Sequence, residues 1–101
     1  MKLLVVMCLK EYQDDACKLF KQANINVFSS TEIIGFRDGK TKSLLGDWFA
    51  SGDEKFDSLM AFSFTGDENA ETCMQLIKNY NEDRKPDFLI RAFIVPVEKS
   101  I

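Results

Sequence analysis

The stretch Thr31-Glu-Ile-Ile-Gly-Phe36, together with the polar segment 37–55 that follows it, decides how this chain is interpreted. The stretch ends a run of alternating apolar and polar residues that reaches Gly35. The segment after it holds Gly39, Gly46 and Gly52 among mixed charges. A long loop inside a small domain more often has a function than serves only as a connection. We therefore expect a strand that leads into a working loop.

Hydrophobic patterns on both sides of the loop predict four strands and two helices. A continuous apolar run predicts a buried strand over 3–9, and alternation predicts strands over 26–35, from Phe56 onward, and over 88–97. Apolar residues at helical spacing predict one helix from Asp14 to Ala23 that Asn24 ends, and a second helix from 70 to 80 whose start is a capping box, Thr65-Gly-Asp-Glu68. Pro96 near the end of the last strand suggests a sheet edge or a bulge there.

This order of elements predicts an α+β, ferredoxin-like βαββαβ fold, in which two helices cover one face of a four-stranded antiparallel sheet. The length of 101 residues fits a single domain, 1–101. Two helices leave the second face of the sheet uncovered, and an apolar face of that size is more than a monomer usually exposes. We therefore expect copies to associate through the open face. That face carries either of two sets: Phe56, Met60, Phe62 and Phe64, or the set with Leu59 and Ala61.

Composition narrows the functional classes. The formal net charge of −3 argues against a nucleic-acid surface. The chain has no histidine, so the commonest general base and metal ligand is missing, and we expect neither an enzyme nor a metal site. Cys8, Cys17 and Cys73 form no C-x-x-C pair, which fits a protein of the reducing cytoplasm. No apolar run approaches about 20 residues, so we expect no membrane insertion.

Three strings, in order along the chain, resemble the PII family of signal-transduction proteins. The stretch from Asp14 to Asn26 is similar to the first helix of the family and its exit, with Asn24 where glycine is usual. Thr31–Phe36 is similar to the family string T-E-V-x-G-F, which ends the second strand at the base of the T-loop. Val95-Pro-Val-Glu-Lys-Ser-Ile101 resembles the closing strand, V-x-P-V-E-x-A-I. The resemblance therefore spans nearly the whole chain.

The resemblance implies a trimer that binds adenine nucleotides or related effectors in clefts between subunits. It implies a loop, here 37–55, that docks on a target, often a membrane transporter or an enzyme. The effector residues it implies are Gly35, Phe36, Arg37 and Arg91, and the apolar loop residues suited to docking are Leu44, Leu45, Trp48 and Phe49. Residues 83–90 replace the family's glycine-rich turn, so we do not expect a triphosphate to bind in the usual manner.

Other interpretations stay open at this point. Arg91 could be an ordinary surface cation or a partner of Glu32, and the apolar residues of the loop could fold back onto the domain. A small oligomeric enzyme on the same frame could use Glu32 or Asp57 as its acid or base. A trimeric metal-tolerance protein has the same topology, but its case is weakened by the missing histidines.

Overall fold

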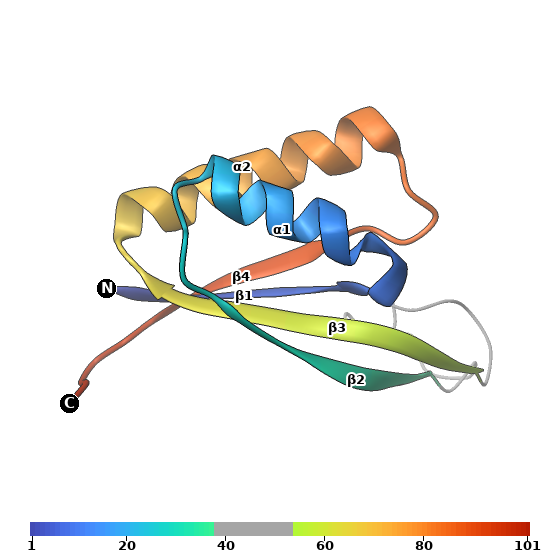
Figure 1. Cartoon of the computed structure of the whole chain (residues 1–101), viewed down its shortest axis with the longest axis horizontal. Coiled ribbons are helices and arrows are strands. Elements are labelled where there is room, and N and C mark those ends of the chain that lie inside the picture. The colour runs from blue at the N-terminus through green and yellow to red at the C-terminus, as the bar shows by residue number, and fades with distance from the viewer. Residues whose placement is uncertain (38–53) are drawn as a thin grey trace.

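The structure, a computed structural model, describes residues 1–37 and 54–101 and confirms the predicted fold. The strands pair antiparallel in the order β2-β3-β1-β4. Figure 1 shows both α-helices on one side of this sheet. The elements are β1 (Lys2–Leu9), the 3₁₀ helix η1 (Lys10–Tyr12), α1 (Gln13–Gln22), β2 (Ser29–Arg37), β3 (Glu54–Thr65), α2 (Asp67–Arg84) and β4 (Arg91–Pro96). The interior of the predicted loop, 38–53, lies outside the described residues, as do Leu44, Leu45, Trp48 and Phe49.

The end of α1 is the one that the sequence predicts. Asn24 adopts φ 61°, in the left-handed region. Its N–H donates to the Lys21 carbonyl at 3.0 Å, and the Ile25 N–H donates to the Phe20 carbonyl at 2.9 Å. These two bonds form a Schellman motif, which satisfies carbonyls at the helix end. Ile25 is 2% exposed, so the apolar contact after the stop is also present.

The start of α2 corrects a prediction. Thr65 is the last residue of β3, where it pairs with Lys2, and the N-cap of α2 is Gly66 with no side-chain hydrogen bond. The predicted capping box is therefore wrong, because β3 continues through Thr65, the residue that was expected to cap the helix. Helix α2 then runs to Arg84, and Lys85 turns the chain with φ 45°. In the described residues no helix is long and apolar enough to cross a membrane.

The core lies between the sheet and the two helices. Phe20 of α1 is 1% exposed, and its ring stacks on Phe28 with centroids 4.6 Å apart. The segment between α2 and β4 is fixed to the core by Asn81, whose side chain forms two hydrogen bonds with the backbone of Ile90. Buried residues on the helix-covered side include Leu4, Val6, Cys8, Ala16, Leu59, Ala61, Cys73 and Ile77.

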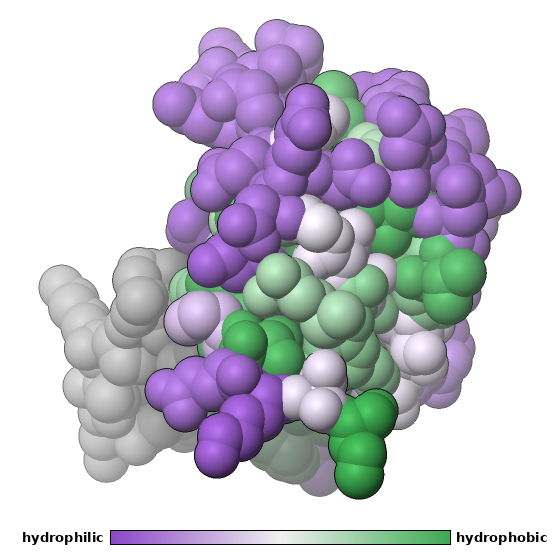
Figure 2. Space-filling model, turned by 90° about the vertical axis from the view of Figure 1, so that its left-hand side faces the viewer, coloured by the Kyte–Doolittle hydropathy of each residue, from purple (hydrophilic) through white to green (hydrophobic). Residues whose placement is uncertain are grey.

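The other side of the sheet carries an apolar surface that no described element covers. The β1–β3 register places Leu59 and Ala61 beside Cys8 and Val6, in the core, so the set with Phe62 faces outward. We call this surface the open face; its apolar members are Leu3, Val5, Met7, Met60, Phe62, Phe64, Phe93 and Val95, each half-buried or exposed. Figure 2 shows hydrophilic residues over the helices and hydrophobic residues gathered below them, over the sheet.

The three free cysteines differ in exposure, which gives a first testable prediction. Cys8 and Cys73 are 7% and 0% exposed, and burial raises the pKa of each thiol to about 11, whereas Cys17 is half-buried. At pH 8 a thiol of that pKa is about one thousandth thiolate, the reactive form. We expect iodoacetamide to label the folded chain once, at Cys17, as read by peptide mass mapping. Labelling in urea should reach all three; equal labelling of Cys8 and Cys17 in the folded chain would contradict the burial.

Candidate functional site

Three of the predicted effector residues, Gly35, Phe36 and Arg37, lie where β2 and β3 form their last pairs before segment 38–53. Gly35 pairs with Phe56, and Phe36 pairs with Lys55. Gly35 is buried, whereas Phe36 is 67% exposed with the Lys55 ammonium 5.7 Å from its ring centroid. The string Thr31–Phe36 thus ends at an exposed aromatic ring beside a cation, at the base of the predicted loop. Nothing is described for the side chain of Arg37.

Two adjoining hollows lie next to this end of the sheet, and Lys10 and Asp57 line both. The larger measures about 520 Å³ and the smaller about 300 Å³. The Lys10 ammonium bonds to Glu32 Oε1 at 2.7 Å. This hydrogen bond, with the charges of Glu32 and Asp57, raises the pKa of Lys10 above its ordinary value. The remaining lining residues are Leu9, Glu11, Gln13 and Phe56 in the larger hollow and Glu32, Ile33, Ile34 and Ser58 in the smaller one.

The carboxylates considered as an acid/base pair lie in an exposed setting. The side chain of Glu32 is 69% exposed and is already bonded to Lys10, and Asp57 is also exposed. The contribution of such an exposed ion pair to stability is small, about 0 to 1 kcal/mol. Glu32 is therefore one partner of an exposed ion pair with Lys10.

Arg91 lies on the open face, at the start of β4. Its register partner is Met7, which faces Met60 across β1 and β3. The Nε atom of Arg91 is buried and has no hydrogen-bond partner in the described structure. Glu32 pairs with Leu59 and lies on the opposite side of the sheet, so the alternative that Arg91 pairs with Glu32 is wrong.

Strand geometry separates Arg91 from Gly35 within one chain. Thr31, Met60, Met7 and Arg91 form one row across the sheet, and Gly35 lies four residues farther along β2. Three strand spacings and four residues of rise put the two backbones roughly 20 Å apart. The structure therefore does not bring these two predicted residues together in one chain. A small ligand can contact both only where a second chain approaches.

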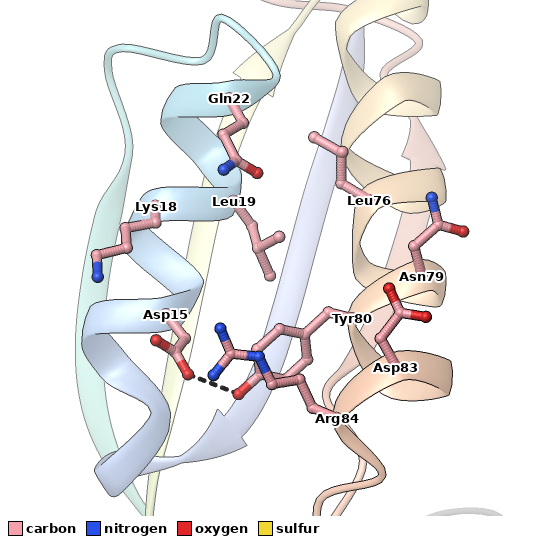
Figure 3. Close-up of a pocket in the computed structure, with 9 residues that line it drawn as sticks. All are labelled: Asp15, Lys18, Leu19, Gln22, Leu76, Asn79, Tyr80, Asp83 and Arg84. Atoms are coloured by element: carbon pink, nitrogen blue, oxygen red, sulfur yellow. Dashed lines mark hydrogen bonds between the residues drawn. The ribbon is translucent and has the colours of Figure 1, made fainter.

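A third hollow, of about 250 Å³, lies between α1 and α2 on the far side from the sheet. Figure 3 shows Leu19 and Leu76 pointing toward each other across it. At one end the Tyr80 hydroxyl donates to Asp15 Oδ2 at 2.7 Å, and the Arg84 guanidinium lies 5.5 Å from the Tyr80 ring centroid. Burial, and then the bond to Asp15, raises the pKa of Tyr80 to about 12. This hollow is a contact between helices whose polar groups already engage each other.

Sequence reasoning missed two contacts at the sheet end. The Phe56 and Phe88 rings lie 5.9 Å apart, which joins the turn before β4 to the start of β3. The second contact is that of Lys10, which lines both hollows and bonds to Glu32. Neither contact has a local signal, because each joins segments that only the strand order brings together. The sequence shows that Phe56 and Phe88 are apolar, but it does not show that their rings contact each other.

Comparison with known proteins identifies the fold. No family model matches the chain, and no curated protein matches its sequence. A PII-like signalling protein from Thermus thermophilus is 14% identical, with a TM-score of 0.60 over 92% of this chain and 82% of that one. CPII, a nitrogen regulatory PII-like protein from Thiomonas intermedia, is 13% identical, with a TM-score of 0.64 over 99% and 94%. That structure is bound to ADP, AMP and bicarbonate.

A third solved structure matches over almost the same extent. It is a DUF3240 family protein from Shewanella baltica, 18% identical, with a TM-score of 0.55 over 98% of this chain and 91% of that one. Two of the three matches span 98% or more of this chain. This chain therefore has the fold of the PII-like signalling proteins.

Proposed function

We propose that this protein is a trimeric PII-like regulator that binds a small effector between subunits and engages a partner protein through loop 37–55. The observation that carries the proposal is the apolar open face, which needs a cover that no described element of the chain supplies. Association through this face removes the apolar side chains from water, at about 25 cal/mol for each Å² buried. The similarity in fold to PII-like signalling proteins supports the same interpretation.

We propose that the effector contacts Gly35, Phe36 and Arg37 of one subunit and Arg91 of a neighbour. A second chain is required because Gly35 and Arg91 lie on distant parts of one sheet. Gly35 allows a ligand to approach the backbone, and the guanidinium of Arg91 can bind an anionic group. An adenine nucleotide is the first ligand to test, since CPII was solved with ADP and AMP.

We further propose that effector binding reorders loop 37–55, so that Leu44, Leu45, Trp48 and Phe49 engage a membrane transporter or an enzyme. Order–disorder change of a loop is a common switching mechanism. The protein would act by binding rather than catalysis, which fits the absence of histidine and the exposed, paired state of Glu32. A cytoplasmic location is part of the proposal and fits the three free cysteines.

Isothermal titration calorimetry against ATP, ADP, AMP and cyclic AMP tests the effector site. We expect saturable binding near one site per chain by at least one of them. Arg91→Ala should lower that affinity by roughly tenfold or more, because a hydrogen bond to a charged group contributes about 1.5 to 3 kcal/mol. Arg84→Ala is the matched control, since Arg84 lies on α2 beside Tyr80, away from the open face. No binding by any nucleotide, or equal losses in both variants, would reject the proposed site.

A further inference from the structure

The hollow between α1 and α2 lies apart from the proposed effector site. Its lining residues come from the two helices, on the side that points away from the sheet, so association through the open face would leave it accessible. Its volume is about 250 Å³. Pockets for drug-sized ligands measure roughly 300 to 1,000 Å³, so this hollow suits a molecule of fewer atoms.

Tyr80 holds one cation and one anion at the same end of this hollow. Its hydroxyl donates to Asp15 Oδ2 at 2.7 Å, and the Arg84 guanidinium lies 5.5 Å from its ring centroid. Figure 3 shows the three side chains gathered there. Among the side chains that the structure describes, neither Asp15 nor Arg84 belongs to an ion pair. The Oδ1 atom of Asp15 and the N–H groups of Arg84 are therefore available to a ligand.

Two leucines give the hollow an apolar floor beside these charges. Leu19 is 8% exposed and Leu76 is half-buried, and the two side chains point toward each other across the hollow (Figure 3). An aliphatic group that lies on them is removed from water, which favours binding. A small ligand for this hollow therefore combines an aliphatic part with one positive and one negative group.

We propose that the hollow between α1 and α2 binds a free α-amino acid with an aliphatic side chain. The ligand carboxylate bonds to the guanidinium fork of Arg84, its ammonium group bonds to Asp15, and its side chain lies on the leucine floor. An anion alone meets the carboxylate of Asp15, and a cation alone meets Arg84, so charge complementarity selects the zwitterion. The inference goes beyond the proposed function and does not depend on it, because the described residues of the sheet do not line the hollow.

Titration of the full chain with L-leucine, followed by heteronuclear NMR of the backbone amides, tests the proposal. We expect saturable shifts confined to α1 and α2, with a dissociation constant of roughly 0.1 to 1 mM for a ligand of about nine non-hydrogen atoms. Isocaproate is leucine without its ammonium group, and isoamylamine is leucine without its carboxylate. Each should bind roughly tenfold more weakly or worse, because each leaves one charged side chain without its partner.

Arg84→Gln and Asp15→Asn each remove one charge from the hollow. Asp15→Asn keeps an oxygen that can accept from the Tyr80 hydroxyl, so the contact between the helices is retained. We expect either variant to bind L-leucine roughly tenfold more weakly. Arg84→Gln should also bind L-leucine and isoamylamine with nearly equal affinity, which a merely structural role of the arginine would not produce. Lys78→Gln, exposed on α2 outside the hollow, is the matched control and should bind as the wild type does.

Each contrary outcome rejects a stated part of the proposal. An absence of shifts at about 10 mM L-leucine, tenfold or more above the expected dissociation constant, rejects the site. Shifts outside the two helices place the amino acid elsewhere and reject the site as well. Equal binding of isocaproate and L-leucine shows an anion site on Arg84 and rejects the zwitterion. Nucleotide calorimetry reads the proposed effector site separately and should not change in Arg84→Gln, so either proposal can fail alone. Circular dichroism confirms that each variant is folded.

Discussion

Phe62→Glu should convert the proposed trimer into a folded monomer. Phe62 lies in the middle of the open face, beside Val5 on β1 and in an edge contact with Phe64, with ring centroids 6.5 Å apart. Its burial between copies would contribute roughly 2 to 3 kcal/mol per chain. A carboxylate at this position has no described cation beside it, so closing the interface would bury an unpaired charge, which costs several kcal/mol more. We expect the loss of all association at micromolar concentration.

Sedimentation velocity gives the readout. The wild type should sediment near 35 kDa, three times the chain mass of 11.6 kDa, and Phe62→Glu near the mass of one chain. Val27→Glu is the matched control, since Val27 is 84% exposed and lies outside the strands of the sheet. It introduces the same charge in place of an apolar residue and should leave the trimer intact. An unchanged mass for Phe62→Glu would show that the open face is not the interface.

The fold could be predicted because its signals are local. Apolar spacing in α1 and the left-handed stop at Asn24 are set by a few neighbouring residues, and the helix ends where they indicate. The sequence does not tell which of the two residue sets on β3 faces the core, because alternation separates the two faces of a strand without showing which one is buried. Only the pairing of β1 with β3 decides it, since Cys8 lies beside Leu59 in the core.

The candidate site was predictable in part. The position of Gly35 and Phe36 at the end of β2 follows from the string that contains them. The lack of a partner for Arg91 does not follow from the sequence, because a carboxylate such as Glu32 is available until the strand order places it on the other side of the sheet. The bond between Lys10 and Glu32 is equally non-local. Residues that meet through strand order leave no pattern in a short window of sequence.

Asn81→Ala should destabilise the domain, because it removes the two bonds that fix the segment before β4. The Asn81 Nδ2 atom donates to the Ile90 carbonyl at 2.8 Å, and its Oδ1 atom accepts from the Ile90 N–H at 3.0 Å. Ile90 is 1% exposed, so water cannot easily replace either bond. Leaving two backbone groups unpaired should lower the free energy of unfolding by about 2 to 4 kcal/mol. Urea denaturation followed by circular dichroism measures this loss.

Asn79→Ala separates the role of Asn81 from the general effect of replacing asparagine in a helix. Asn79 is exposed on the same helix, and its Oδ1 atom accepts from the Gln75 side chain at 3.0 Å. Alanine favours helix more than asparagine does, so this control should change the stability by less than about 0.5 kcal/mol. Both variants must be compared with the wild type at one protein concentration, because association shifts apparent stability. If Asn81→Ala and Asn79→Ala unfold alike, the two bonds to Ile90 do not hold the start of β4, and Arg91 is positioned by the strand pairing alone.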